Sequence, residues 1–271
     1  MLAACINYVV AAVGCALWAS AAGSWNSQTL ILGGLAGFTY VSSLVLMLPT
    51  MRRSGVSITG AVVQLSLMVP VAVSIWRFGE RPNELQTLGI VTTAVALPLL
   101  AGSSGSSGDA QPRRLSPLVP ILFLSTGSSQ VVMKEFAAVR PPGDLPLYSA
   151  ALFASASVFT ALWMAFSGDT GRHDDASPSG GEHPQLDEGK ELSEGGIGVL
   201  LGIINVLQLV FLLLALRELP AIIVFPVSAA LGITVNALLS MALWKERPRP
   251  SAWLGIALAV AAVVLLNWKS E

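Results

Sequence analysis

The residues of this chain that could do chemistry are polar side chains set inside long apolar runs. Lys134 is the only basic residue close to the interior of such a run, and it follows Gln130 by four positions. Turned inward, its ammonium could anchor an anionic substrate or act as the counter-charge of a proton relay. Turned outward beside Glu135, the flexible side chain would reach solvent, which is the simpler alternative. The candidates for lining a substrate cavity are Asn7, Tyr40, Gln64, Gln130, Lys134, Asn205, Gln208 and Asn236.

The elements that must position these residues are long apolar helices. Of 271 residues, 54% are hydrophobic and only 11% are charged, whereas an ordinary soluble domain carries about 25% charged residues. A helix that crosses a bilayer needs about 20 mostly apolar residues. Nine stretches meet this requirement: 3–22, 29–49, 56–77, 84–101, 116–134, 146–167, 196–216, 220–244 and 251–268. The sequence therefore predicts an all-α integral membrane protein with nine transmembrane helices.

Some of the candidates share a helical face with paired glycines, since positions i, i+4 and i+7 lie on one stripe of a helix. The two stripes are Gly33, Gly37 and Tyr40 in one stretch, and Gly198, Gly202, Asn205 and, one turn later, Gln208 in another. Glycines permit close approach of two helices, and polar side chains in a membrane face the bundle interior or a wet cavity. Two interpretations stay open for these polar residues: hydrogen bonding between helices, or a substrate cavity.

Polar residues concentrate in two segments between the apolar stretches. Residues 102–114 read GSSGSSGDAQPRR, a composition typical of flexible linkers. Residues 168–194 hold eight of the sixteen acidic residues, two basic residues and both histidines, His173 and His183. The histidines have acidic neighbours, but the surrounding Gly, Ser and Pro residues provide no fixed geometry for a metal. We predict a solvated acidic loop, no metal site and no cofactor.

Self-similarity is the most informative feature of the chain. Residues 65–100 align without a gap on residues 231–266, at an offset of 166. Glu-Arg-Pro recurs at residues 80–82 and 246–248, and Leu-Gly-Ile recurs at residues 88–90 and 254–256. Each Glu-Arg-Pro lies in a short turn in which Pro starts the next helix. We therefore expect each Glu to lie near the positive end of the helix that follows it.

The repeat predicts two copies of one unit in opposite orientations. The stretch 29–49 matches 196–216 at an offset of 165, so each helix corresponds to the one five helices later. Because five is odd, the copies must cross the membrane in opposite directions, as in many secondary transporters. Residues 1–101 form the first repeat with four helices, residues 102–115 the linker, and residues 116–268 the second repeat with five helices and the acidic loop at 168–194. The count suggests that the first helix of a ten-helix fold is missing, and a natural protein of nine helices is the alternative.

The two copies resemble the EamA-like drug/metabolite transporter superfamily. In that family each copy has an acidic and basic turn between its last two helices, followed by a glycine in the final helix. The corresponding turns are Phe78-Gly79-Glu80-Arg81-Pro82 and Trp244-Lys245-Glu246-Arg247-Pro248, and the corresponding helices carry Gly89 and Gly255. Asn7-Tyr8 followed by Val-Val-Ala also resembles the family's second helix. The resemblance covers nearly all of the chain except the acidic loop, and it implies a ten-helix fold and transport of small molecules.

These features predict a secondary transporter that moves a small metabolite by alternating access. The sequence contains no phosphate-binding Gly-x-x-x-x-Gly-Lys-Ser/Thr motif that would indicate a primary energy source. The expected partners are a small-molecule substrate and the lipid bilayer, with the plasma or inner membrane as the expected location, and a homodimer is compatible with the sequence. A formal net charge of −1 gives no reason to expect nucleic acid. Substrate, coupling ion, direction and orientation stay open.

Two other classes of function are weighed against transport. An intramembrane enzyme is disfavoured because His-Glu-x-x-His, Gly-x-Ser-x-Gly and paired mid-span aspartates are missing from the sequence. A non-transporting membrane scaffold or sensor, with the acidic loop as its contact surface, stays the alternative. It is favoured by the helix count, because a transporter that lacks one helix of its cavity would be expected to lose activity.

Overall fold

The structure is a computed structural model, and it describes residues 2–23, 25–54, 56–101, 116–167, 194–244 and 250–268. Helix dominates these residues, and no β-strand occurs among them. The predicted linker at 102–115, most of the predicted acidic loop (168–193) and the second Glu-Arg-Pro turn lie outside the described residues. The described part of the chain confirms the all-α class.

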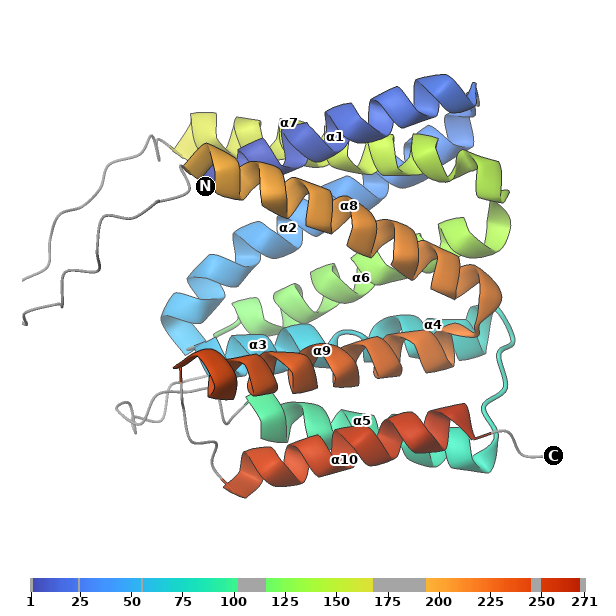
Figure 1. Ribbon diagram of the computed structural model, residues 1–271, viewed down its shortest axis with the longest axis vertical. Coiled ribbons are helices and arrows are strands. Elements are labelled where there is room, and N and C mark those ends of the chain that lie inside the picture. The colour runs from blue at the N-terminus through green and yellow to red at the C-terminus, as the bar shows by residue number, and fades with distance from the viewer. Residues whose placement is uncertain are drawn as a thin grey trace, which may run out of the picture. The chain divides into compact units, whose positions relative to one another are not determined.

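Ten α-helices and one 3-10 turn make up the described residues (Figure 1). The helices are α1 (Leu2–Ala22), α2 (Ser27–Ser54), α3 (Val56–Leu65), α4 (Met68–Arg77), α5 (Glu84–Ala101), α6 (Leu118–Val139), α7 (Leu145–Ser167), α8 (Glu194–Glu218), α9 (Ala221–Trp244) and α10 (Pro250–Asn267). The 3-10 turn, Pro142–Asp144, directly precedes α7. Each predicted apolar stretch coincides with one helix, except that residues 56–77 form two.

Several of these helices have the length and composition of membrane spans. Five segments among the described residues qualify: Cys5–Ala22, Ser27–Ser54, Ile58–Arg77, Pro142–Phe166 and Gly196–Glu218. Large apolar side chains cover the outer surfaces of the helices, as Trp76 and Phe166 illustrate with exposed fractions of 85% and 86%. Soluble proteins seldom expose large apolar patches. The chain is therefore an all-α membrane protein.

The break between α3 and α4 lies just before a proline. Pro70 has no backbone N–H and so cannot continue the helical hydrogen-bond pattern. The chain tightens at this point: the Val69 N–H donates to Ser66 O at 3.0 Å, and the Leu67 N–H donates to Gln64 O at 3.2 Å. Bonds between residues three apart are typical of a 3-10 turn. The sequence from residue 56 to residue 77 therefore forms two short helices in series.

The helices form two compact units that differ from the repeats predicted in the sequence. Unit 1 consists of Met1–Phe38 and Gly143–Val210, and unit 2 consists of Thr39–Pro142 and Phe211–Glu271. Each unit thus combines segments of both predicted repeats. In unit 1, α1 packs along α7, and in unit 2, α5 packs along α10 (Figure 1). In each packed pair, the two helices are equivalent members of the two predicted repeats.

Glycines bring the helices of unit 1 into backbone contact. A Cβ atom added at Gly37 on α2 would overlap Ser155 Oγ and Leu152 O on α7. A Cβ atom added at Gly202 on α8 would lie only 2.9 Å from Asn7 O on α1. A residue with a side chain would therefore have to displace the neighbouring backbone. Close approach through small residues is a common way for membrane helices to pack.

Helices α1 and α7 repeat one burial pattern at an offset of 145 residues. Four buried positions correspond: Asn7, Tyr8, Ala11 and Cys15 in α1 match Leu152, Phe153, Ala156 and Thr160 in α7, whereas buried Ala19 matches half-buried Met164. The same offset relates the glycine contacts, because Gly202 meets the carbonyl of Asn7 as Gly37 meets the carbonyl of Leu152. The two helices thus occupy corresponding environments, and five of the eight residues at 11–18 recur at 156–163.

Helices α5 and α10 show the same correspondence at an offset of 166 residues. Three buried positions correspond: Gly89, Thr93 and Ala96 in α5 match Gly255, Ala259 and Ala262 in α10. A Cβ atom at Gly89, near the start of α5, would lie 2.8 Å from Leu266 Cγ, near the end of α10. The two helices therefore run antiparallel, and Figure 1 shows that α1 and α7 do so as well.

Candidate functional site

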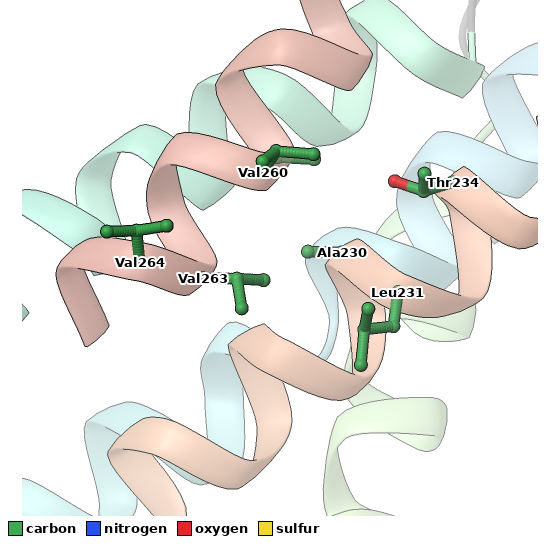
Figure 2. Close-up of a pocket in the computed structure, with 7 residues that line it drawn as sticks. Ala230, Leu231, Thr234, Val260, Val263 and Val264 are labelled. Atoms are coloured by element: carbon green, nitrogen blue, oxygen red, sulfur yellow. The ribbon is translucent and has the colours of Figure 1, made fainter. Parts of the chain in front are cut away.

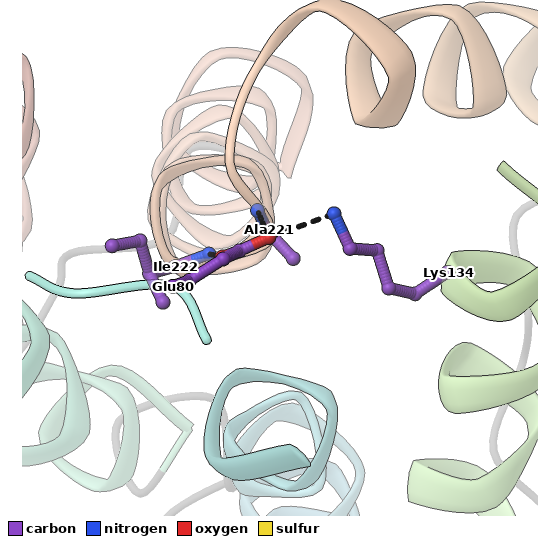
Figure 3. Close-up of polar contacts among 4 residues, drawn as sticks. All are labelled: Glu80, Lys134, Ala221 and Ile222. Atoms are coloured by element: carbon purple, nitrogen blue, oxygen red, sulfur yellow. Dashed lines mark hydrogen bonds and ion pairs between the residues drawn. The ribbon is translucent and has the colours of Figure 1, made fainter. Parts of the chain in front are cut away.

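A buried ion pair joins three elements at one end of unit 2. Glu80 follows α4, and its Oε1 lies 2.7 Å from Nζ of Lys134 on α6. The backbone N–H groups of Ala221 and Ile222, at the start of α9, donate to the two oxygens of the Glu80 carboxylate, each at 3.1 Å. Figure 3 shows Lys134 extended from α6 toward the carboxylate. The side chains are only 8% and 13% exposed, so solvent screens the pair weakly.

The turn after α4 positions Glu80. Gly79 has a φ of +67°, in the left-handed region that glycine adopts without steric cost. The carbonyl of Ser74 accepts the N–H groups of both Phe78 and Glu80, each at 3.2 Å. The chain therefore folds back on the last turn of α4 and directs Glu80 to α9. The ring of Phe78 lies 5.5 Å from Lys134 Nζ, a distance at which an aromatic ring attracts a cation.

Two sources of positive charge stabilise the Glu80 carboxylate. The start of a helix presents N–H groups without partners within the helix and carries about half a positive charge. Lys134 adds a full charge on the other side of the carboxylate. A second pair, Arg77 with Glu135 at 3.9 Å, is more exposed and is expected to contribute little. The Glu80 carboxylate therefore bonds α4, α6 and α9 together as a charged group.

A stripe of polar side chains runs along α6 toward the ion pair. Thr126, Gln130 and Lys134 are four residues apart, and Ser129 lies on the same face of the helix. Within the described residues, Thr126 Oγ1, Ser129 Oγ and Gln130 Oε1 are buried without a hydrogen-bond partner, and so is Ser74 Oγ on α4. A buried polar atom without a partner costs about 1–3 kcal/mol. The stripe thus offers hydrogen-bonding groups that a polar ligand could satisfy.

A second positively charged side chain, Arg217, bonds to the C-terminal end of α6. Arg217, in the last turn of α8, donates from Nη1 to Arg140 O at 2.8 Å and from Nη2 to Pro141 O at 3.2 Å. Its guanidinium also lies 5.3 Å from the ring of Phe136. Carbonyl groups at a helix end carry partial negative charge and attract cations. The end of α6 is therefore held to α8 by Arg217 as it is held to α9 by Lys134 and Glu80.

In unit 1 two of the three polar candidates, Asn7 and Asn205, bond to each other. Nδ2 of Asn205 on α8 donates to Oδ1 of Asn7 on α1 at 3.0 Å. Thr29 Oγ1 donates to Oδ2 of Asp144 at 2.7 Å, and both side chains are buried. Gln208, one turn after Asn205, is exposed. Hydrogen bonding between helices thus occurs at Asn7 and Asn205, and a place for them in a substrate cavity stays a prediction.

The remaining candidates all belong to unit 2. Gln130 and Lys134 lie on the α6 stripe of unit 2, whereas Tyr40 on α2 and Gln64 on α3 are half-buried elsewhere in that unit. Asn236 lies in α9, but its side chain is outside the described residues. Lys134 does not reach solvent, because its exposed fraction is 7% and its ammonium pairs with Glu80. The outward alternative for Lys134 is therefore wrong.

The helix end that Glu80 occupies also differs from the expectation. The sequence placed Glu80 at the start of the next helix, α5, but its carboxylate bonds the start of α9. Helix α5 is instead capped by Asn83 and Gln86: the Gln86 N–H donates to Asn83 Oδ1 at 2.7 Å, and the Asn83 N–H donates to Gln86 Oε1 at 3.0 Å. This reciprocal pattern resembles a capping box, and the Asn-x-x-Gln spacing was its signal. No local signal links Glu80 to Ala221, 141 residues away.

The pockets of unit 2 differ in chemistry. A cavity of about 160 Å³ lies between α9 and α10. Among its lining residues, which Figure 2 draws, Thr234 provides the only hydroxyl. A shallow depression of about 470 Å³ beside α6 has two hydroxyls, Ser125 and Ser128, among apolar neighbours such as Val69. The cavity between α9 and α10 is lined almost entirely by apolar side chains and therefore suits a hydrocarbon group. Among the described residues, no cluster of three or more His, Cys, Asp or Glu side chains could hold a metal.

Comparison with known proteins finds a similar fold but gives no information on activity. No family model matches the chain, and no curated protein matches it. The chain is similar to a solved structure described as "Crystal structure of protein", with a TM-score of 0.68 and 15% sequence identity. The likeness covers 98% of this chain and 88% of the other. At this identity the likeness shows a shared fold alone.

Proposed function

We propose that the chain is a secondary transporter that moves a small metabolite across a membrane by alternating access. The observation that carries the proposal is the correspondence between the two halves of the sequence. Helices α1 and α7 share one burial pattern, α5 and α10 share another, and both pairs run antiparallel. Such a relation is expected of inverted repeats, in which one repeat moves against the other around a fixed site.

The proposal extends to the membrane topology and the family. Nine helices cross the membrane, four in the first repeat and five in the second, in an EamA-like arrangement. The helices found at all nine apolar stretches support this count. The plasma or inner membrane is the proposed location, and a bilayer and a small substrate are the proposed partners.

Within this proposal the α6 stripe forms part of the substrate path, and the Glu80–Lys134 pair closes one end of it. The ion pair bonds α4, α6 and α9 together, so that end of unit 2 can open only when the pair separates. An ammonium has three N–H donors, and an anionic group of the substrate could replace Glu80 as their partner. This favours a substrate that carries a carboxylate or a phosphate.

The experiment is uptake by liposomes that contain the purified full chain. A panel of labelled carboxylates, sugar phosphates, amino acids, sugars and amines is screened, with and without unlabelled substrate inside the vesicles. We expect uptake above that of empty liposomes and its acceleration by internal substrate, which is a property of alternating access. If folded protein neither moves nor binds any member of the panel, the transport proposal is wrong.

Variants of the folded protein then test the path. Lys134→Gln should reduce uptake of an anionic substrate, and Lys134→Arg should retain more of it because the charge remains. Arg53→Gln is the matched control, since it removes an exposed positive charge from the same unit at the end of α2. Unchanged uptake by Lys134→Gln would remove Lys134 from the path.

A membrane scaffold or sensor is the second candidate, and the excess of acidic residues at 168–194 favours it. A scaffold that uses this loop would lose its partner when residues 168–194 are replaced by a neutral linker of equal length. A transporter would retain its flux after the same replacement. Flux and partner binding of one variant therefore separate the two functions.

A further inference from the structure

A cavity of about 300 Å³ lies in unit 1 between α1 and α8. We refer to it as the α1–α8 groove. Its lining includes Val10, Gly14 and Trp18 from α1, and Gly202, Ile203 and Leu207 from α8. No lining side chain carries a charge, and Cys15 and the Trp18 indole provide its polar groups. Because polar groups are costly to bury without hydrogen bonds, the groove suits an apolar occupant.

The corresponding contact in the same unit, between α2 and α7, shows what fills such a space. In the repeat, Gly14 of α1 is equivalent to Phe159 of α7 at the offset of 145 residues. Ile203 of α8 is equivalent to Phe38 of α2 at the offset of 165 residues. The rings of Phe38 and Phe159 pack edge to face, with centroids 5.0 Å apart and an interplanar angle of 63°. At Gly14, by contrast, an added Cβ atom would meet nothing within 4 Å. The volume that a benzyl group fills in one half is therefore open in the other.

The surroundings of the groove indicate where its occupant comes from. Val13 and Leu17 beside the groove on α1 are 56% and 67% exposed, and Leu207 on its α8 side is 50% exposed. These large apolar side chains mark a surface that faces lipid hydrocarbon. A second copy of the chain is a poorer occupant, because a stable protein interface uses about 20–30 residues a side and nine residues line the groove.

We propose that the α1–α8 groove is a lipid site that binds one acyl chain of a bilayer lipid in the place that Phe159 fills in the other half. The acyl chain packs on Gly14 and Gly202 and against the Trp18 side chain. The site depends on the membrane location of α1 and α8 and on the correspondence between α1 and α7. It does not depend on transport.

Photolabelling tests this site. The full chain is reconstituted in phosphatidylcholine vesicles that contain a phosphatidylcholine with a photoreactive diazirine in one acyl chain, and labelled residues are mapped by mass spectrometry. We expect labelling to concentrate on the groove residues relative to other lipid-facing residues of α1 and α8. In Gly14→Phe the ring should fill the groove, and labelling should fall to the level of those other residues. Val13→Phe is the matched control, since it adds the same ring outside the groove and should retain the labelling.

A reciprocal variant keeps the test decisive if Gly14→Phe does not fold. Phe159→Gly opens the corresponding space between α2 and α7, and labelling should then appear around Phe38. The proposal is overturned if labelling is uniform over the exposed faces, or if folded Gly14→Phe keeps the groove labelling. It is also overturned if Phe159→Gly gains no labelling. If light scattering shows that Gly14→Phe alone converts a dimer to a monomer, the occupant is a second copy and the proposal is wrong.

Discussion

Units 1 and 2 join the two halves of the sequence through different chemistry. In unit 1, α1 meets α8 through glycine contacts and an uncharged amide pair, Asn7 with Asn205. In unit 2, α4 and α6 meet α9 through the buried Glu80–Lys134 ion pair. Loss of one partner from a neutral pair costs less than loss of one partner from a buried charged pair, which leaves an unpaired charge in a poorly solvated place. Of these two contacts, the ion pair in unit 2 is therefore the one at which a ligand or a change of charge would alter the packing most.

The largest effect is expected when the ion pair loses one partner. Lys134→Met leaves the Glu80 carboxylate with the N–H groups of α9 but without a cation. The free energy of unfolding should fall by about 3–5 kcal/mol. It can be measured by titrating the protein in mixed micelles with a denaturing detergent while following helix content. The double variant Glu80→Gln/Lys134→Met should recover much of the loss, because neither charge remains.

The comparison between the units fails if the double variant is as unstable as Lys134→Met. In that case the loss reflects the packing of the Lys134 side chain rather than an unpaired carboxylate. It also fails if Lys134→Met costs no more than the loss of the neutral pair in unit 1.

The next largest effect is expected at the glycine contact of unit 1. In Gly37→Ala the new Cβ would overlap Leu152 O and Ser155 Oγ. Overpacking of this kind costs about 1–3 kcal/mol. Gly34→Ala is the matched control, since a Cβ there meets nothing within 4 Å. That variant should be unchanged or slightly more stable, because alanine favours helix over glycine. The same detergent titration measures both, and equal stability of the two variants would contradict the contact.

Sequence reasoning reached the helices but little of the site. Apolar runs of sufficient length located the helices, except that residues 56–77 form two helices instead of one. The repeat drew attention to Gly37 and Gly202, which the structure shows in close contacts. The partner of Glu80 was missed because it lies 141 residues away and helix propensity carries no information about such pairing. The division into two units was also missed. It depends on which segments pack together, and each unit combines segments from both halves.

The correspondence between α1 and α7 shows a second limit. Asn7 and Leu152 occupy equivalent buried positions although their side chains differ in chemistry. Residues 11–18 and 156–163 nevertheless share five of eight residue types at this offset, so residue types and burial both relate the two helices, but neither shows by itself where a space is left open. Burial is a property of the packed structure, so the α1–α8 groove could not be inferred from the sequence.

A smaller effect is expected for a neutral contact in unit 2. Asn83→Ala removes the side-chain oxygen that caps α5 by accepting the Gln86 N–H. Loss of such a cap typically costs about 1 kcal/mol. The variant sharpens the comparison because it shows how unit 2 responds when no charge is involved. Asn83→Asp should retain most of the stability, since a carboxylate also accepts the Gln86 N–H. A loss as large as that of Lys134→Met would show that unit 2 is sensitive for reasons other than charge.

The smallest effect is expected for the amide pair of unit 1. Asn205→Leu removes the donor to Asn7 Oδ1, and polar pairs between membrane helices contribute about 0.6 kcal/mol on average. A double-mutant cycle with Asn7→Leu isolates this coupling from other effects of the substitutions. Gln208→Leu on the exposed side of α8 is the control and should leave the free energy of unfolding unchanged. A coupling as large as that between Glu80 and Lys134 would mean that the neutral pair is as critical as the charged one. The distinction between the two units would then have to rest on something other than charge.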